Sequence, residues 1–237
     1  MSPTVKEHSK RPLVAVAATA LLLPAMMSLA LEAAEKSPDA GKPKAEKPAT
    51  QSVTAGKPAK DLFDGKTLAG WKVTDFAGHG EVEVKDGRII LGSGIMTGIT
   101  WTNDLPRIDY EISLDAMRVE GSDFFCGLTF PVKEDPCSLI VGGWGGGVVG
   151  LSSLDGQDAA NNETTHYMNF QSGRWYNVRL RVTGTNITAW IDKDKLIDAD
   201  ITGKTISVRP EVEASKPLGI ASWSTAAALR NLKLRRL

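Results

Sequence analysis

Residues 108–116 read Ile-Asp-Tyr-Glu-Ile-Ser-Leu-Asp-Ala, a strict alternation of apolar and polar side chains. Side chains of an extended strand point alternately to its two faces, so a period of two places every apolar group on one face. Residues 176–182 and 187–191 repeat the alternation. Each of these segments is therefore predicted to be a strand with one face against a hydrophobic core.

Outward from these segments, shorter apolar runs lie between clusters of glycine and polar residues. Asp86-Gly87 separates two such runs and is typical of a tight hairpin turn. No window of about 12 residues shows a helical face. The sequence therefore predicts an all-β domain over residues 61–237, an antiparallel two-sheet β-sandwich or jelly roll. The further predicted strands cover residues 81–85, 88–91, 124–130, 138–141, 148–151, 217–223 and 229–237.

The charge balance argues against a function in nucleic-acid binding. The chain has 237 residues with 28 Lys or Arg and 28 Asp or Glu, whereas a dedicated nucleic-acid-binding protein carries a basic surplus. From Asp61 onward there are 23 acidic and 19 basic residues, a net charge of −4. Only three His are present, which leaves little for a His-rich metal site. We expect no nucleic-acid partner, no metal site and no cofactor.

The first 30 residues have the pattern of a secretory signal peptide. A basic head with Lys6, Lys10 and Arg11 precedes an apolar run over residues 13–23, and Ser28-Leu29-Ala30 offers small residues at the cleavage positions. This predicts cleavage after Ala30, a secreted or periplasmic protein, and no membrane attachment afterwards. The alternative is an uncleaved anchor, because residues 13–31 are nearly long enough to span a bilayer.

Residues 31–60 are predicted to be a disordered linker rich in Lys, Pro and Ala. Residues 32–60 contain four Pro, six Lys and no aromatic residue. Such a segment cannot bury enough apolar surface to offset the entropy lost on ordering.

Trp144 stands among five glycines in residues 142–147. Glycine allows sharp turns and a close approach of a ligand to the backbone. An indole on such a loop is a candidate platform for the apolar face of a sugar ring. The alternative is that Trp144 fills the core while the glycines turn the corner.

Residues 155–166 form the most polar run of the domain, and five of them are candidate site residues. Asp155, Asp158 and Asn162 are candidates for binding sugar hydroxyls, because carboxylates and amides pair with hydroxyl donors and acceptors. Glu163 and His166 are candidates for general acid and base. The alternative is a solvated surface loop built from ordinary turn-forming residues.

Cys126 and Cys137 are the only cysteines, and export makes a disulfide permissible. If residues 131–136 form the loop of a symmetric hairpin, Cys126 lies opposite residue 141 and Cys137 opposite residue 130. A bridge then needs an offset register or a bulge, because its Cα atoms must approach within about 7 Å. Both states of the two thiols stay open.

The two ends of the domain carry a family resemblance. Residues 61–71 (DLFDGKTLAGW) resemble the opening of the 3-keto-disaccharide hydrolase domain family, and residues 217–221 (PLGIA) and 229–234 (LRNLKL) resemble its last two strands. Residues 109–115 and 173–177 resemble two of its middle strands more weakly. The resemblance spans residues 61–237.

The resemblance implies a concanavalin A-like jelly roll that cleaves the glycosidic bond of sugars oxidised at C3. A C3 ketone acidifies the C2 proton, so a base can remove it while an acid protonates the departing oxygen. Asp115 and Asp123 are the carboxylates matched to the family. We therefore predict Glu163 or His166 as base or acid, with Asp115 and Asp123 in support and Trp144 as the stacking platform.

Other positions depart from the family. Residues 125–131 lack its polar Asn and its Arg, and Trp223 stands where a His is frequent. A non-catalytic module that binds a glycan or a protein partner, and a structural domain without a ligand, are the alternatives. Convergence of Trp144, Asp155, Glu163 and His166 in one cleft would favour a function on a ligand.

Overall fold

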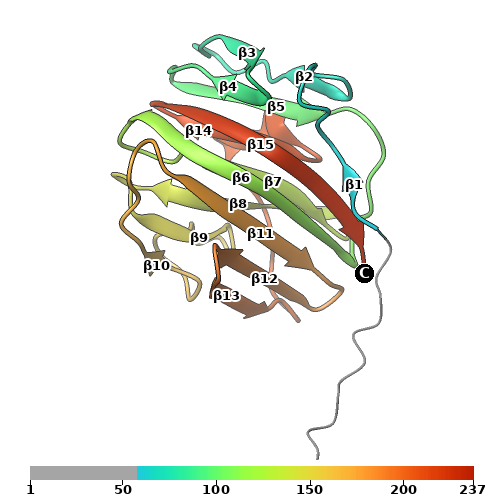
Figure 1. Ribbon diagram of the computed structural model, residues 1–237. Helices are drawn as coiled ribbons and strands as arrows, with labels where there is room; N and C mark the ends of the chain where they lie inside the picture. The colour runs from blue at the N-terminus through green and yellow to red at the C-terminus, as the bar shows by residue number, and fades with distance from the viewer. Residues whose placement is uncertain (1–57) are drawn as a thin grey trace, which may run out of the picture. The chain divides into compact units, whose positions relative to one another are not determined.

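Two antiparallel sheets face each other across a hydrophobic core, which confirms the predicted all-β sandwich (Figure 1). The structure is a computed structural model and describes residues 58–237. The predicted signal peptide, and the predicted linker up to residue 57, lie outside the described residues. Lys60, the last residue of the predicted linker, already belongs to strand β1 (Lys60–Asp61).

Each sheet joins strands that are far apart in the chain. The eight-stranded sheet consists, in spatial order, of β13 (Asp194–Asp200), β12 (Asn186–Ile191), β11 (Trp175–Val182), β6 (Tyr110–Gly121), β15 (Thr225–Arg236), β4 (Arg88–Leu91) and β3 (Val82–Lys85), and β1 also pairs with β15. The seven-stranded sheet consists of β10 (His166–Tyr167), β9 (Val148–Ser152), β8 (Asp135–Gly143), β7 (Cys126–Val132), β14 (Gly219–Trp223), β5 (Met96–Trp101) and β2 (Trp71–Val73). Figure 1 shows β6 and β15 side by side along the length of the eight-stranded sheet.

The alternation in the sequence matches the two faces of the strands. In β6, Tyr110, Ile112, Leu114 and Ala116 are almost completely buried between the sheets. Burial of one large aliphatic side chain stabilises the fold by about 1.5–3 kcal/mol. The predicted strands 108–116, 176–182 and 187–191 are confirmed as β6, β11 and β12.

Strand β5 has no counterpart among the predicted strands. All six of its residues are buried, because its inner face meets the core and its outer face is also covered. A strand that is buried on both faces does not alternate, which removes the pattern that identified β6.

The cysteines are free and buried in the seven-stranded sheet. Cys126 pairs with Val141 and Cys137 with Phe130 in the β7–β8 hairpin, which is the symmetric register considered above. The two thiols are therefore offset along the ladder and make no disulfide. Burial raises the pKa of each thiol to about 12.

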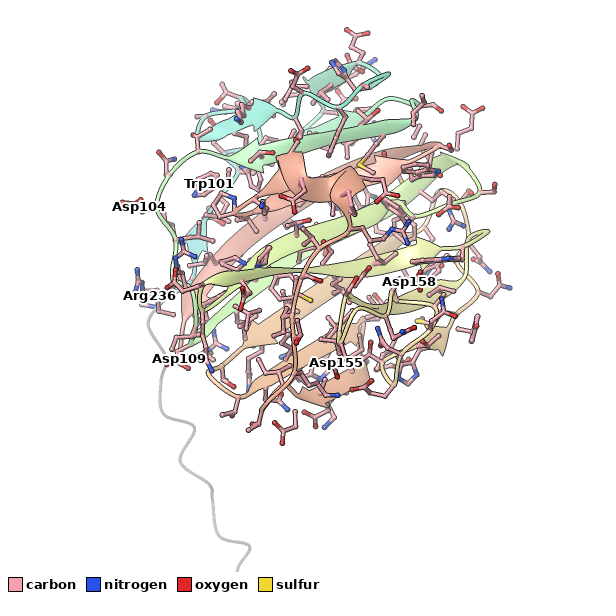
Figure 2. All side chains as sticks on the ribbon, turned by 180° about the vertical axis from the view of Figure 1, so that it is seen from behind. Trp101, Asp104, Asp109, Asp155, Asp158 and Arg236 are labelled. Carbon is pink, nitrogen blue, oxygen red and sulfur yellow. The ribbon has the colours of Figure 1, made fainter. Side chains whose placement is uncertain are left out.

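A long connection between the two sheets crosses the outer face of the seven-stranded sheet. We call this connection, residues 201–218, the strap. It contains η1 (Pro210–Ser215), the only helix among the described residues, and Figure 2 shows it in front of the strands. Ser153 and Ser207 exchange backbone hydrogen bonds of 2.7 and 3.2 Å, and Thr100 Oγ1 donates to Ala214 O at 3.1 Å. Within residues 58–237, no helix has the length and apolar character needed to cross a membrane.

Candidate functional site

An open groove of about 710 Å³ lies beside the strap on the outer face of the seven-stranded sheet. This volume includes space open to solvent; the part accessible to water within the groove is about 220 Å³, below the range of about 300–1,000 Å³ typical of small-molecule sites. Strands supply the floor, and the strap and the loops before β7 and after β8 supply the walls. The lining residues are Met96, Asp123, Phe124, Ser138, Ile140, Trp144, Ser152, Arg209, Glu211, Val212 and Trp223.

Trp144 lies in the wall of this groove. Its side chain is 44% exposed, so the interpretation as a core-filling residue is wrong and the interpretation as an exposed indole is supported. The residue has a φ of 49°, and Gly145 and Gly146 have φ values of 83° and 107°. Consecutive left-handed conformations are strained for residues with a Cβ, which explains the glycines around the indole. Phe124 and Trp223 add a second aromatic surface, with ring centroids 6.5 Å apart.

Arg118 holds the Trp144 loop from inside the sandwich. Its guanidinium is buried and donates to Gly146 O at 2.8 Å and to Gly142 O at 3.2 Å. It also donates to Asp123 O at 3.2 Å and Phe170 O at 3.4 Å, and it makes no salt bridge among the described residues. Desolvation lowers the pKa of Arg118. One side chain thus ties together three segments, two of which contribute residues to the groove.

Asp123 is held at the base of the same loop. One carboxylate oxygen accepts a hydrogen bond from Phe124 N at 2.7 Å, and the other accepts one from Gly145 N at 3.4 Å. The backbone N–H of Asp123 donates to Thr225 Oγ1 at 3.0 Å. These bonds fix the carboxylate beside the indole of Trp144.

Arg209 and Glu211 bring a guanidinium and a second carboxylate from the strap. Arg209 binds Glu211 with two N–H groups at 2.9 and 3.3 Å and Asp158 with a third at 3.2 Å, which uses three of its five donors. The hydrogen bonds from Arg209 hold the pKa of Glu211 below its ordinary value, and Glu211 raises the pKa of Arg209. Asp158 therefore orients a cation that lines the groove, and does not line it itself.

Two serine hydroxyls lie in the floor. Ser138 Oγ is 2.9 Å from Thr129 Oγ1, so it has a partner within the protein. Ser152 is 2% exposed and its Oγ has no partner. Buried polar atoms are nearly always hydrogen-bonded, so this hydroxyl, which lies beneath the surface of the groove, is an exception.

Three residues of the polar run stabilise the protein's own loops. Asn162 Nδ2 donates to the carbonyl oxygens of residues 151, 157 and 158, and its Oδ1 accepts from Thr164. Glu163 and Asp155 contact Lys204 of the strap at 2.5 and 3.4 Å. The hydrogen bond from Lys204 lowers the pKa of Glu163, and that from the Thr205 backbone lowers the pKa of Asp155. Figure 2 shows Asp155 and Asp158 on this loop.

The remaining two candidates lie elsewhere. His166 pairs with Val149 in the edge strand β10 and does not line the groove. Asp115 lies on the outer face of the eight-stranded sheet, where it contacts Asn231 at 2.7 Å and Arg230 at 3.2 Å. Of the eight predicted residues, Asp123 and Trp144 line the groove, and Asp158 contacts its wall through Arg209. The groove therefore does not bring together the four residues Trp144, Asp155, Glu163 and His166.

The comparisons with known proteins agree with the fold. Residues 58–235 match the model of the 3-keto-alpha-glucoside-1,2-lyase-like domain family, which confirms the resemblance seen in the end segments. No curated protein matches the chain. The Crh5 transglycosylase in complex with NAG is 12% identical with a TM-score of 0.52, over 76% of this chain and 83% of that chain. An endo-acting O-glycanase of the human gut microbiota is 12% identical with a TM-score of 0.50, over 77% of this chain and 100% of that chain.

Proposed function

The chain belongs to the 3-keto-alpha-glucoside-1,2-lyase-like domain family, and from this premise we propose that its groove cleaves α-glucosides oxidised at C3. The observation that carries the proposal is the meeting of an exposed indole, a carboxylate and an oriented guanidinium at Trp144, Asp123 and Arg209. Sugar sites commonly combine an aromatic platform with a few fixed polar groups.

The chemistry is an elimination across C1 and C2. The C3 ketone acidifies the proton on C2, and Asp123 removes it to leave an enolate. The C1–O bond then breaks, C1=C2 forms, and the departing oxygen takes the proton from the Asp123 carboxyl group, which leaves an alcohol and restores the carboxylate. The sugar ring keeps its C3 ketone conjugated with the new double bond. Addition of water across that bond completes a net hydrolysis, the reaction implied by the family resemblance.

The other lining groups have distinct parts in this proposal. Arg209 retains two unused N–H groups and stabilises the negative charge that develops on the enolate oxygen. Trp144 stacks on the sugar. Glu163, His166 and Asp115 have no part, because none of them lines the groove.

The assay uses the purified protein and maltose oxidised at C3 of the non-reducing glucose. We expect release of glucose together with ultraviolet absorbance from the conjugated ketone, and no release from unoxidised maltose. Absence of glucose release from the 3-keto sugar would refute the proposed reaction.

One observation favours a second function, non-catalytic binding of a glycan. Glu211, the other carboxyl group of the groove, is held ionised by Arg209, so it is a poor proton donor to a departing oxygen. Calorimetric binding of 3-keto-maltose without any turnover would select this alternative.

Removal of the indole is expected to weaken sugar binding. Trp144→Ala should raise the dissociation constant of 3-keto-maltose about tenfold, because stacking on one aromatic ring contributes about 0.5–1.5 kcal/mol beyond area burial. The fold should persist, since the indole lies outside the core.

Calorimetry measures this change, and Trp190→Ala is the matched control. Trp190 lies on the eight-stranded sheet under Arg179, whose guanidinium is 3.9 Å from its ring centroid. An equal loss of affinity in both variants would contradict a specific role for Trp144.

We also propose that the protein is exported to the periplasm or the medium. The basic head, apolar run and small residues that end at Ala30 support this proposal. Sequencing of the mature N-terminus should begin at Leu31, whereas a retained Met1 would refute cleavage.

A further inference from the structure

A second hollow opens on the other side of the Trp144 loop. It is a shallow depression with a volume of about 470 Å³, and it is lined by Arg118, Gly121, Ser122, the glycines 145–147 and residues 167–170. Trp144 lines the groove, whereas the glycines that follow it line the hollow. Asp123 and Ser122, which are adjacent in the chain, are divided between the two in the same way. The two spaces therefore share their walls.

The hollow carries an exposed aromatic side chain of its own. Tyr167 is 76% exposed, the largest value among the exposed large hydrophobic residues of the described chain. It pairs with Val148, which packs with Phe124 and Ile140 in the cluster on the outer face of the seven-stranded sheet. Paired residues in an antiparallel ladder point to the same face, so Tyr167 is on the face that carries the groove.

Two glycines of the shared wall, Gly146 and Gly147, leave little room for a side chain. A Cβ added to Gly146 would lie 2.9 Å from Ser122 O, and one added to Gly147 would lie 3.2 Å from Met168 O. Gly146 also has a φ of 107°, which side chains disfavour. These two glycines therefore let the loop after Trp144 pack closely against the backbone of residues 122 and 168, which line the same hollow.

Arg118 is a buried charged residue in the lining of the hollow. The residue is 5% exposed, its Nε has no partner, and its four hydrogen-bond acceptors are all uncharged carbonyls. Its positive charge, which the nearby Asp123 carboxylate offsets only in part, favours the lone pairs of hydroxyl oxygens in the hollow.

We infer that the hollow is a second sugar-binding subsite, and that the substrate is an α-linked glucan chain longer than a disaccharide. This inference rests on the proposed function. The oxidised sugar occupies the groove, and the glycosidic oxygen that departs from it continues into a chain whose next units stack on Tyr167. An aromatic side chain with a polar tip suits a sugar, which has one apolar face and a rim of hydroxyl groups.

The experiment measures affinity as a function of chain length. The probes are maltose, maltotriose and maltotetraose, each oxidised at C3 of the non-reducing glucose. Calorimetry is done with the full protein carrying Asp123→Asn, so that the probes are not consumed. We expect the affinity to rise about tenfold from maltose to the longer probes, the contribution of one further stacked ring.

Tyr167→Ala in the same background should abolish that rise and leave the affinity for 3-keto-maltose unchanged, and Tyr167→Phe should preserve the rise. An equal rise in the Tyr167→Ala protein, or no rise with length in the parent, would overturn the subsite. If the disaccharide binds and wild-type protein cleaves it in either case, the proposed function survives. If no probe binds, both fail.

Discussion

Replacement of Asp123 by Asn should lower kcat for cleavage of 3-keto-maltose by about 10²–10⁴-fold, the usual contribution of a positioned general base. Asn retains a carbonyl oxygen that can accept the short hydrogen bond from Phe124 N and loses only the 3.4 Å bond from Gly145 N, so the loop should keep its conformation. The amide cannot take up the C2 proton. The expected result is therefore a loss of kcat with little change in KM or in the melting temperature.

Steady-state kinetics and thermal unfolding measure these quantities together, with Asp104→Asn as the control. Asp104 is an acidic residue remote from the groove lining, and Figure 2 shows it at the far edge of the molecule from Asp158. Glu163→Gln and His166→Gln discriminate between the two assignments of the base. If either of them costs as much as Asp123→Asn, the proton transfer belongs to the polar loop and the assignment to Asp123 is refuted.

Strands β6 and β5 illustrate which parts of the fold the sequence pattern predicts and which it does not. The alternation in residues 108–116 predicted β6 because a strand with one solvated face has polar residues on that face and apolar residues on the buried face. The same logic failed for β5, because the strap covers its outer face at Thr100. Covering that strand is a long-range event, since Ala214 is 114 residues away in the chain.

The residues that line the groove were predictable from the sequence only in part, for a similar reason. Two lining residues were identified from the sequence: Trp144 from its glycine neighbours, and Asp123 from the family motif. Arg209 and Glu211 have no local pattern, and the contact that orients Arg209 comes from Asp158, 51 residues earlier. The polar composition of residues 155–166 suggested groups that bind a ligand. Composition does not reveal that Asn162 already donates hydrogen bonds to three backbone carbonyls of the protein itself.

The strand alternation of β6 buries Arg118, and hydrogen bonds from Arg118 hold the loops beside the groove. The alternation that buries Leu114 and Ala116 continues to position 118, and this places an arginine on the inward face at the end of β6. A buried guanidinium without a carboxylate is costly unless its donors find acceptors. The carbonyls of residues 123, 142, 146 and 170 supply them, so the loops around the groove assemble on this side chain.

Arg118→Met should therefore destabilise the domain by about 3 kcal/mol, because each buried carbonyl left without a donor costs about 1–3 kcal/mol. For a domain of this size the melting temperature should fall by about 6–12 °C, as measured by calorimetry. The KM for 3-keto-maltose should rise, since the Trp144 loop loses its anchors at Gly142 and Gly146.

Arg118→Lys keeps the charge but not the planar set of donors, so its melting temperature should lie between those of the wild type and Arg118→Met. Arg236→Met, at the exposed end of β15, should change stability by less than about 0.5 kcal/mol. An Arg118→Met protein with the stability and KM of wild type would show that the groove loops hold their shape without this arginine.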